Sequence, residues 1–495
     1  MSFFSLLPLI LVNIIIIFLF NLSTAADSTY NVQNYGAKSD GISDSSKAFV
    51  SAWTNPATIY VPKGSYLLGN AYFYGQTCKS NAITIRIDGT LVAPSDYNVI
   101  GKSGNWIKFE RVTGVSIIGG TLDGQGTSLW ACKNSGKGCP KGVTTLAFYN
   151  SNNIAISELT SQDSQMFHIL LDGCHNVELQ GVKVSAPQNS PNTDGIHLQS
   201  SSDVTILNSQ IGTGDDCLSI GPGNSNLWIE NIVCGPGHGI SIGSLGWDIQ
   251  EPGVQNVTVR RAAFSETQNG VRVKTWARPS NGFVRNVLFQ HVVMNNVENP
   301  IIIDQNYCPG SGNCPEEGSG IRVSEITYQD VHGTSATEVA VKFDCSKINP
   351  CNGITLLDVK LSYKNQPAEA SCVNAEGKAS GLQQPTSCLQ SSILQQVTEK
   401  VMANKDTEFI VNDQIRSSKN ENLEANEEIW TLRQQMIEIH RAWANGLPPP
   451  PFPTDNVKYL SSLPPVSHAQ FSSIQTLPIF IFSLLNTKLP YASST

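Results

Sequence analysis

Three aspartates and one histidine are the residues of this sequence whose types and spacing could do chemistry. Asp215 and Asp216 are adjacent, Asp194 stands about one repeat before them, and His238 stands about one repeat after them. Crowded carboxyl groups can keep a proton on one member while the others stay ionised, because mutual repulsion raises one pKa. Such a cluster could protonate a leaving oxygen and activate a water molecule, the two tasks of glycoside hydrolysis. Spacing alone does not say which aspartate gives the proton.

Two cations follow this acidic group. Arg272 and Lys274 alternate with Val271 and Val273, so we expect both to point outward from one strand. They could meet the carboxylates of an anionic sugar polymer through charge-assisted hydrogen bonds. The net charge of −8 and the charged fraction of 15% argue against a nucleic-acid binder, which usually has a basic face.

A repeat must position these residues. Asn or Asp precedes an alternating apolar pair at 153, 176, 203, 226, 256 and 286, so successive starts differ by 23, 27, 23, 30 and 30 residues. Such intervals are typical of a solenoid whose coils share one core. Few segments before residue 390 have helical periodicity, which argues against a TIM barrel or a Rossmann fold, since both need a helix after nearly every strand. We predict an all-β, right-handed parallel β-helix, with a strand of three or four residues per coil in each sheet and with the asparagines bonding backbone at turns.

A second column of strands fixes the register. The steps from Ile196 to Leu218 and from Leu218 to Ile240 are both 22 residues. Because adjacent coils lie about 4.8 Å apart, residues at equal offset become direct neighbours. Residues two positions before each start should therefore meet, and these are Asp194, Asp216 and His238.

The same segments resemble a known family. Asn192–Gly195, Gly214–Cys217, Gly237–Gly239 and Arg272–Lys274, in this order, are similar to the four signature motifs of the polygalacturonases of glycoside hydrolase family 28, and Asp304–Cys308 follows them. A single Gly-Asp-Asp would mean little, whereas four ordered motifs in one solenoid are specific. The resemblance extends from about Tyr30 to about Cys388.

The resemblance implies roles for individual residues. Asp215 would be the general acid, Asp194 and Asp216 together would activate water, and His238 would hold the proton of the acid in place. Galacturonate would be bound by four further residues, which are Asn192, Arg272, Lys274 and Tyr307. The reaction would invert the anomeric centre without a metal or cofactor. A separation of one coil step, roughly 5 Å, is however nearer the retaining range than the 6.5–9.5 Å of simple inverting enzymes.

Structural interpretations compete with each of these roles. Aspartates beside glycines often cap turns, a lone histidine is often structural, and paired cations often form a solvated strand face. Tyr307 could instead pack against a disulfide at Cys308. The shared register of the four central residues is what favours catalysis.

The expected partner is polygalacturonate or demethylated pectin, cut by a monomeric, endo-acting enzyme. The alternatives are an exopolygalacturonase, a rhamnogalacturonan or xylogalacturonan hydrolase, a pectate lyase that uses Ca²⁺, and a non-catalytic protein that binds cell-wall pectin.

The ends of the chain and its cysteines indicate secretion. Residues 1–26 read as a cleaved signal peptide rather than a membrane anchor, which places the enzyme in the cell wall. We expect the β-helix over 27–390, a helix-prone extension over 391–446 and a disordered Pro/Ser-rich tail over 447–495. Twelve cysteines favour disulfides, and the short-range candidates are Cys132–Cys139, Cys217–Cys234, Cys308–Cys314, Cys345–Cys351 and Cys372–Cys388.

Overall fold

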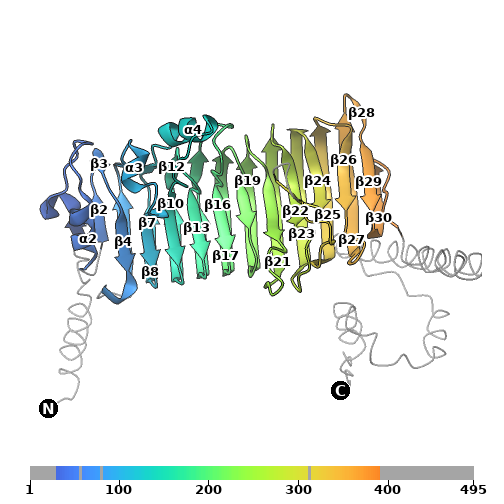
Figure 1. Cartoon of the computed structure of the whole chain (residues 1–495), viewed down its shortest axis with the longest axis horizontal. Helices are drawn as coiled ribbons and strands as arrows, with labels where there is room; N and C mark the ends of the chain where they lie inside the picture. Colours follow the sequence, from blue (N-terminus) through green and yellow to red (C-terminus); the bar gives the residue numbers. More distant parts are fainter. Residues whose placement is uncertain (1–28, 55–57, 78–81, 310–313, 391–495) are drawn as a thin grey trace, which may run out of the picture. The chain divides into compact units, whose positions relative to one another are not determined.

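The computed structural model describes residues 29–54, 58–77, 82–309 and 314–390. The expected signal peptide and both C-terminal segments lie outside these ranges. The described coils stack side by side in one row, from the first strands in blue to the last in orange (Figure 1). None of the helices in the described ranges is long and apolar enough to cross a membrane.

One strand from each coil forms the smaller sheet, in which every pair of neighbouring strands is parallel. Within the described residues it contains β4 (Ala71–Tyr74), β7 (Asn105–Glu110), β10 (Thr144–Tyr149), β13 (Ile169–Asp172), β16 (Ile196–Gln199), β18 (Leu218–Ile220), β20 (Ile240–Leu245), β22 (Asn269–Thr275), β24 (Asn299–Asp304), β26 (Val339–Asp344) and β29 (Glu369–Val373).

The remaining strands form the larger sheet. In the first coils these strands are short: β1 (Thr29–Asn31), β2 (Thr58–Val61), β3 (Ser65–Leu67), β5 (Ile83–Ile87), β6 (Thr90–Val92), β8 (Thr113–Ile118), β9 (Thr121–Asp123), β11 (Asn152–Ser157), β12 (Thr160–Gln162), β14 (His175–Gln180) and β15 (Lys183–Ser185). Later coils use long strands: β17 (Ser202–Gly212), β19 (Ser225–Cys234), β21 (Val254–Ser265), β23 (Phe283–Val297), β25 (Arg322–Ser335), β27 (Cys351–Tyr363) and β30 (Ala375–Gln384), with β28 (Gln366–Pro367) pairing antiparallel to β27.

The prediction of three- or four-residue strands holds for several strands in the first coils of this larger sheet but is wrong for its later coils, where β23 runs for 15 residues. These strands turn corners at residues with left-handed backbone, two or three to a strand in β17, β19, β21 and β23, and continue pairing beyond them. Asn208 in β17 and Asn231 in β19 occupy one such corner, with φ of 52° and 57°. Asparagine tolerates this conformation, so a residue that resembles a strand break in the sequence is a bend within one strand.

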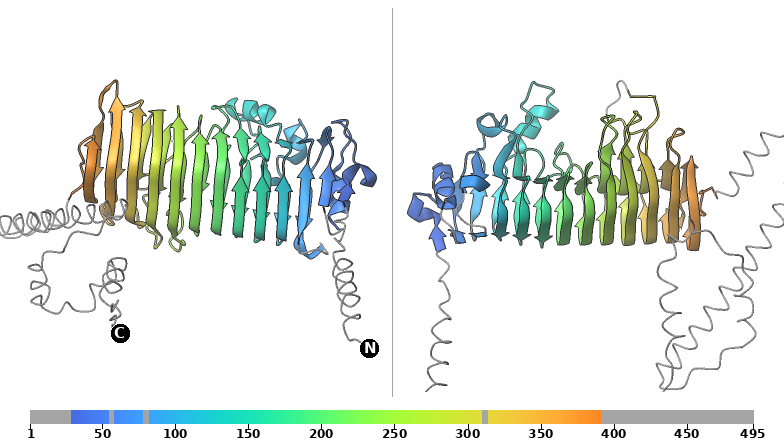
Figure 2. Two further views of the ribbon diagram at one scale, coloured as in Figure 1. Left: turned by 180° about the vertical axis from the view of Figure 1, so that it is seen from behind. Right: turned by 90° about the horizontal axis from the view of Figure 1, so that it is seen from below.

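Within the described ranges the helices are few and lie outside the two sheets. They are α2 (Ser46–Trp53), α3 (Tyr97–Ile100) and α4 (Thr127–Asn134), with 3₁₀ turns at Val32–Tyr35 and Gly75–Thr77. Figure 2 shows α4, in teal, rising from the row of coils on the same side as the loop that follows β24.

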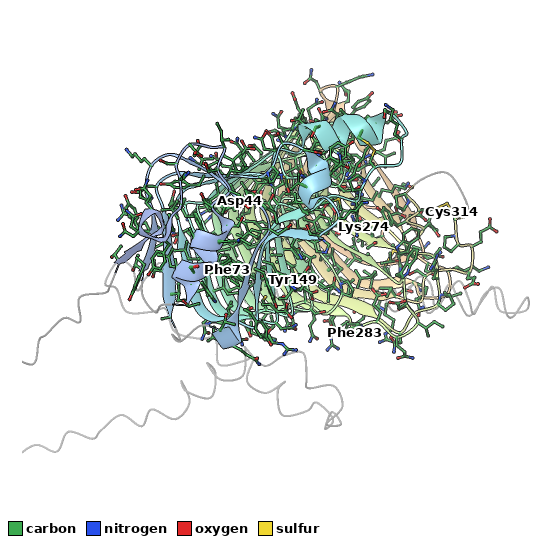
Figure 3. The ribbon with its side chains drawn as sticks, turned by 60° about the vertical axis from the view of Figure 1, so that its left-hand side comes forward. Asp44, Phe73, Tyr149, Lys274, Phe283 and Cys314 are labelled. Carbon is green, nitrogen blue, oxygen red and sulfur yellow. A yellow bond between two sulfur atoms is a disulfide. The ribbon has the colours of Figure 1, made fainter. Side chains whose placement is uncertain are left out.

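The core is a column of aliphatic and aromatic side chains between the sheets. Ile196, Leu218 and Ile240 stack in register and are buried. The rings of Phe73 and Phe109 stack at 4.7 Å in the first coils, where Phe73 lies in the interior (Figure 3). Because every coil adds its apolar residues at the same offset, outward residues are held in columns as well.

Disulfides close the loops between strands. All five predicted pairs are confirmed. Cys174 is a buried free thiol, and Cys78 lies outside the described residues.

Candidate active site

The predicted register holds at the site. Ile196 pairs with Leu218 and Leu218 with Ile240, on β16, β18 and β20. Just before these strands, the Gly195 N–H donates to the Asp216 carbonyl at 2.9 Å and the His238 N–H to the Asp215 carbonyl at 2.7 Å. The loop segments before the strands therefore keep the same coil spacing, and the structure brings Asp215, Asp216 and His238 together.

Asp216 is the most enclosed of the three aspartates, with 1% of its side chain exposed. Its Oδ1 accepts hydrogen bonds from Ser241 Oγ and an Arg272 guanidinium nitrogen, both at 2.8 Å. Its Oδ2 accepts from Lys274 Nζ at 2.7 Å. Burial opposes ionisation, but Lys274 and then Arg272 outweigh it, and the pKa of Asp216 is held below its usual range. The two cations therefore favour the ionised form of Asp216.

Asp215 faces the surface more than Asp216 does, with 21% of its side chain exposed. Its Oδ1 accepts the N–H of Asp216 at 2.9 Å and lies 3.0 Å from His238 Nδ1. Among the described residues, none hydrogen-bonds Oδ2. One oxygen is thus fixed by the protein, and the other remains able to exchange a proton with a bound molecule.

Asp194 is almost completely buried, close enough to Asp215 and Asp216 to be repelled by both. Its Oδ2 is 3.3 Å from Nδ1 of His197, whose ring stacks on Phe167 with centroids 4.4 Å apart. Burial, together with repulsion from Asp215 and Asp216, raises the pKa of Asp194 to about 6, although the His197 contact works against this rise. The three aspartates are therefore chemically unequal in spite of their common residue type.

Arg272 and Lys274 point outward from β22 as expected, while Val271 and Val273 lie in the core. Figure 3 labels Lys274 among the side chains of this sheet. Both cations bind Asp216 first, so only their remaining N–H groups are open to another anion. Their side chains are 10% and 8% exposed, which restricts access to these donors.

Two predicted binding residues lie at the margins of the cluster. Tyr307 places its ring 5.3 Å from Lys274 Nζ and 5.9 Å from the guanidinium carbon of Arg272, and it packs edge-on against Trp276 at 5.5 Å. Asn192 is exposed, with left-handed backbone at φ 58°, two residues before Asp194.

Two participants were missed from the sequence. His197 orients Asp194, and Ser241 bridges Asp216 and Arg272, whose Nε donates to Ser241 Oγ at 2.9 Å. Each is the second residue of its strand, His197 of β16 and Ser241 of β20, and both stand in one column with Arg272. Their alignment with the aspartates is the signal that could have identified them.

The site also has three potential metal ligands. Asp215, Asp216 and His238 offer atoms within 4.8 Å of one another. Both oxygens of Asp216 already accept from cationic side chains, so a metal ion would compete with Arg272 and Lys274. The donor set therefore fits proton transfer better than metal binding.

The chain is similar to known proteins. The family model of glycosyl hydrolases family 28 matches residues 52–388. The chain is 62% identical to a polygalacturonase of Prunus persica over 384 residues, 76% of this chain and 98% of that protein. It is 43% identical to an exopolygalacturonase of Platanus acerifolia over 373 residues, 73% and 98% of the two chains. Its fold is similar to that of an endo-xylogalacturonan hydrolase from Aspergillus tubingensis, with a TM-score of 0.62 at 23% identity over 72% of this chain and 100% of that one.

Proposed function

Since the chain belongs to glycoside hydrolase family 28 and is a glycoside hydrolase of the polygalacturonase type, we propose that it hydrolyses the α-1,4-galacturonosidic bonds of polygalacturonate within the polymer and inverts the anomeric centre. The observation that carries the proposal is the unequal surroundings of the three aspartates. One is fixed as a carboxylate by two cations, one has a raised pKa, and one has a free oxygen toward the surface.

In the proposed mechanism Asp215 is the general acid. Its Oδ2 gives a proton to the glycosidic oxygen as the bond to the anomeric carbon breaks, so that the leaving sugar departs as a neutral alcohol. The contact of His238 with Oδ1 holds the carboxyl group in place.

Asp194 and Asp216 together activate the water in this mechanism. Water attacks the anomeric carbon while its proton passes to an ionised carboxylate of the pair. Asp216 stays ionised because of Lys274 and Arg272, and Asp194 joins it above about pH 6. The stacked pair acts jointly, which is why a separation shorter than that of simple inverting enzymes does not require retention.

The remaining N–H groups of Arg272 and Lys274, with Tyr307 and Asn192, would bind the sugar carboxylate and ring hydroxyls. Aromatic rings beside cations suit an anionic sugar, since the ring covers an apolar sugar face while the cation meets the carboxylate. We further propose that the protein is secreted to the cell wall and acts as a monomer.

Exo action is the second candidate, because a relative at 43% identity is named an exopolygalacturonase. A time course of viscosity against reducing ends on demethylated pectin separates the two. Internal cuts lower viscosity while few reducing ends have formed, whereas terminal cuts leave viscosity high until many have formed. A substrate panel with rhamnogalacturonan and xylogalacturonan tests the other hydrolase alternatives.

The assignment of the acid is tested with the leaving group. An aryl galacturonide with an acidic phenol needs little protonation, so Asp215→Asn should lose far less activity on it than on polygalacturonate. Asp194→Asn should lose activity on both. The opposite pattern would transfer the acid role to Asp194.

A further inference from the structure

A cleft of about 520 Å³ lies between the region of α4 and a segment that ends at Asn192, two residues before Asp194. One wall consists of lysines from the end of α4 and the loop after it, and the other of residues next to the catalytic cluster. The lysines are Lys133, Lys137 and Lys141, and the facing residues include Phe167 and Asn192.

The loop that carries these lysines is held in place. The Cys132–Cys139 disulfide joins the end of α4 to the loop, and the Gly142 N–H donates to the Gly101 carbonyl at 3.0 Å. Lys133 Nζ lies 3.4 Å from Met166 Sδ. The backbone that carries the lysines is therefore fixed before any ligand arrives, which lowers the entropy cost of ordering the loop on binding.

The lysines carry uncompensated charge. No carboxylate of the described residues lies within salt-bridge distance of Lys133, Lys137 or Lys141, although the chain as a whole carries a charge of −8. Partial burial, with repulsion from Lys141, lowers the pKa of Lys133. Concentrated positive charge in a net acidic protein favours an anionic ligand with several charges.

The cleft is linked to the catalytic cluster through two of its lining residues, Phe167 and Asn192. Phe167 lines it and stacks on His197, which contacts Asp194. Asn192 lines it as well, two residues before Asp194. A polymer whose bond is cut at the aspartates could therefore extend past Phe167 to the lysines.

We propose that Lys133, Lys137 and Lys141 form a binding subsite for the carboxylates of galacturonate residues on one side of the cleaved bond. This assignment rests on the proposed function. It adds three substrate-binding lysines and a requirement for free carboxylates on the substrate. Because the lysines would act on charge, the cleft should bind free carboxylates and not their methyl esters.

The test measures binding without turnover. In the full chain carrying Asp215→Asn, calorimetry compares oligogalacturonate affinity with and without the triple change Lys133→Gln, Lys137→Gln and Lys141→Gln. The dissociation constant should rise about tenfold, the sum expected for three largely exposed ion pairs. The same oligomer fully methyl-esterified should lose no affinity on this change.

A matched control removes the same charge elsewhere. Lys183, Lys360 and Lys378 are exposed on β15, β27 and β30 of the larger sheet, and their change to Gln should leave affinity within about twofold. A double variant that keeps Lys133, the one partly buried lysine, covers the case in which the triple variant does not fold.

The outcomes separate a failure of the subsite from a failure of the proposed function. Unchanged affinity in a folded lysine variant, or equal losses in the variant and the control, would overturn the subsite. If the unaltered chain does not hydrolyse polygalacturonate while the lysine variant loses affinity for it, the subsite stands and the proposed function fails. If hydrolysis is present and the affinity is unchanged, the proposed function stands and the subsite fails.

Discussion

Residues stack at the same spacing on two outward faces of the same coils, but one column consists of similar side chains and the other of different ones. On the larger sheet, like stacks on like: the Nδ2 of Asn286 donates to Asn256 at 2.8 Å, Asn256 to Asn226 at 3.0 Å, and Asn226 to Asp203 at 3.0 Å. On the smaller sheet, His197, Ser219, Ser241 and Arg272 share one column beside the aspartates.

The difference lies in whether stacked residues of one type can hydrogen-bond to each other. An amide both donates and accepts, so a column of asparagines completes itself and stabilises the corner of each coil. Carboxylates only accept when ionised and repel one another, so stacked aspartates need protons or cations from elsewhere. A column whose members hydrogen-bond to each other is structural. A column whose members depend on other residue types for protons or cations can replace those partners with groups of a substrate.

Removing the proposed proton donor should have the largest effect on activity. Asp215→Asn keeps the shape of the side chain and should lower kcat on polygalacturonate about 10³-fold, because general acid catalysis contributes on that order. The check is reducing-end release, with circular dichroism to confirm the fold. Activity near that of the unaltered chain would refute the acid role.

Removing one cation tests whether the buried Asp216 carboxylate depends on its cationic neighbours. Lys274→Met leaves Asp216 buried with one cation fewer, and the free energy of unfolding should fall by about 3 kcal/mol. Urea denaturation measures this loss. The double variant Lys274→Met with Asp216→Asn should lose less than the two single losses added together, and simple additivity would show that the pair is not coupled.

The pH dependence tests the raised pKa of Asp194. Its pKa of about 6 in the fold exceeds the ordinary 3.8, so the folded state binds more protons than the unfolded state between those values. This group therefore makes the free energy of unfolding fall as pH rises from about 4 to 6, and Asp194→Asn should remove that contribution. The exposed Asp248→Asn serves as the control. Ionisation of Asp194 should also make kcat/KM rise with pH through about 6, and a profile that is flat there would contradict its role as a base.

The structural face should show the smallest effect. Asn226→Gly permits the same positive φ but removes the side-chain hydrogen bonds to Asp203 and Asn256. We expect a loss of about 1 kcal/mol in the free energy of unfolding, with kcat/KM unchanged. Thermal unfolding and reducing-end assays measure both, and a large loss of activity would show that the two faces are not independent.

The register was predictable because one coil step equals one strand spacing. Equal intervals of 22 residues placed Asp194, Asp216 and His238 together before any contact was known. The asparagine repeat was predicted as well, although its side chains bond each other and not the backbone expected for turns.

The remaining features depend partly on contacts that no repeat encodes. The column that His197 and Ser241 share with Arg272 points to them, but their hydrogen bonds to Asp194 and Asp216 are known only from the structure. Lys133, Lys137 and Lys141 belong to an insertion between strands, so their place beside the site follows from how the loop folds back and not from periodicity.

The most direct test of the central claim is NMR of the first product formed from polygalacturonate in the presence of a calcium chelator. The account predicts a saturated product whose new reducing end has inverted configuration, and no such product from the Asp215→Asn variant. A retained configuration would contradict the joint action of Asp194 and Asp216 on water. An unsaturated product that forms only when Ca²⁺ is restored would contradict hydrolysis itself.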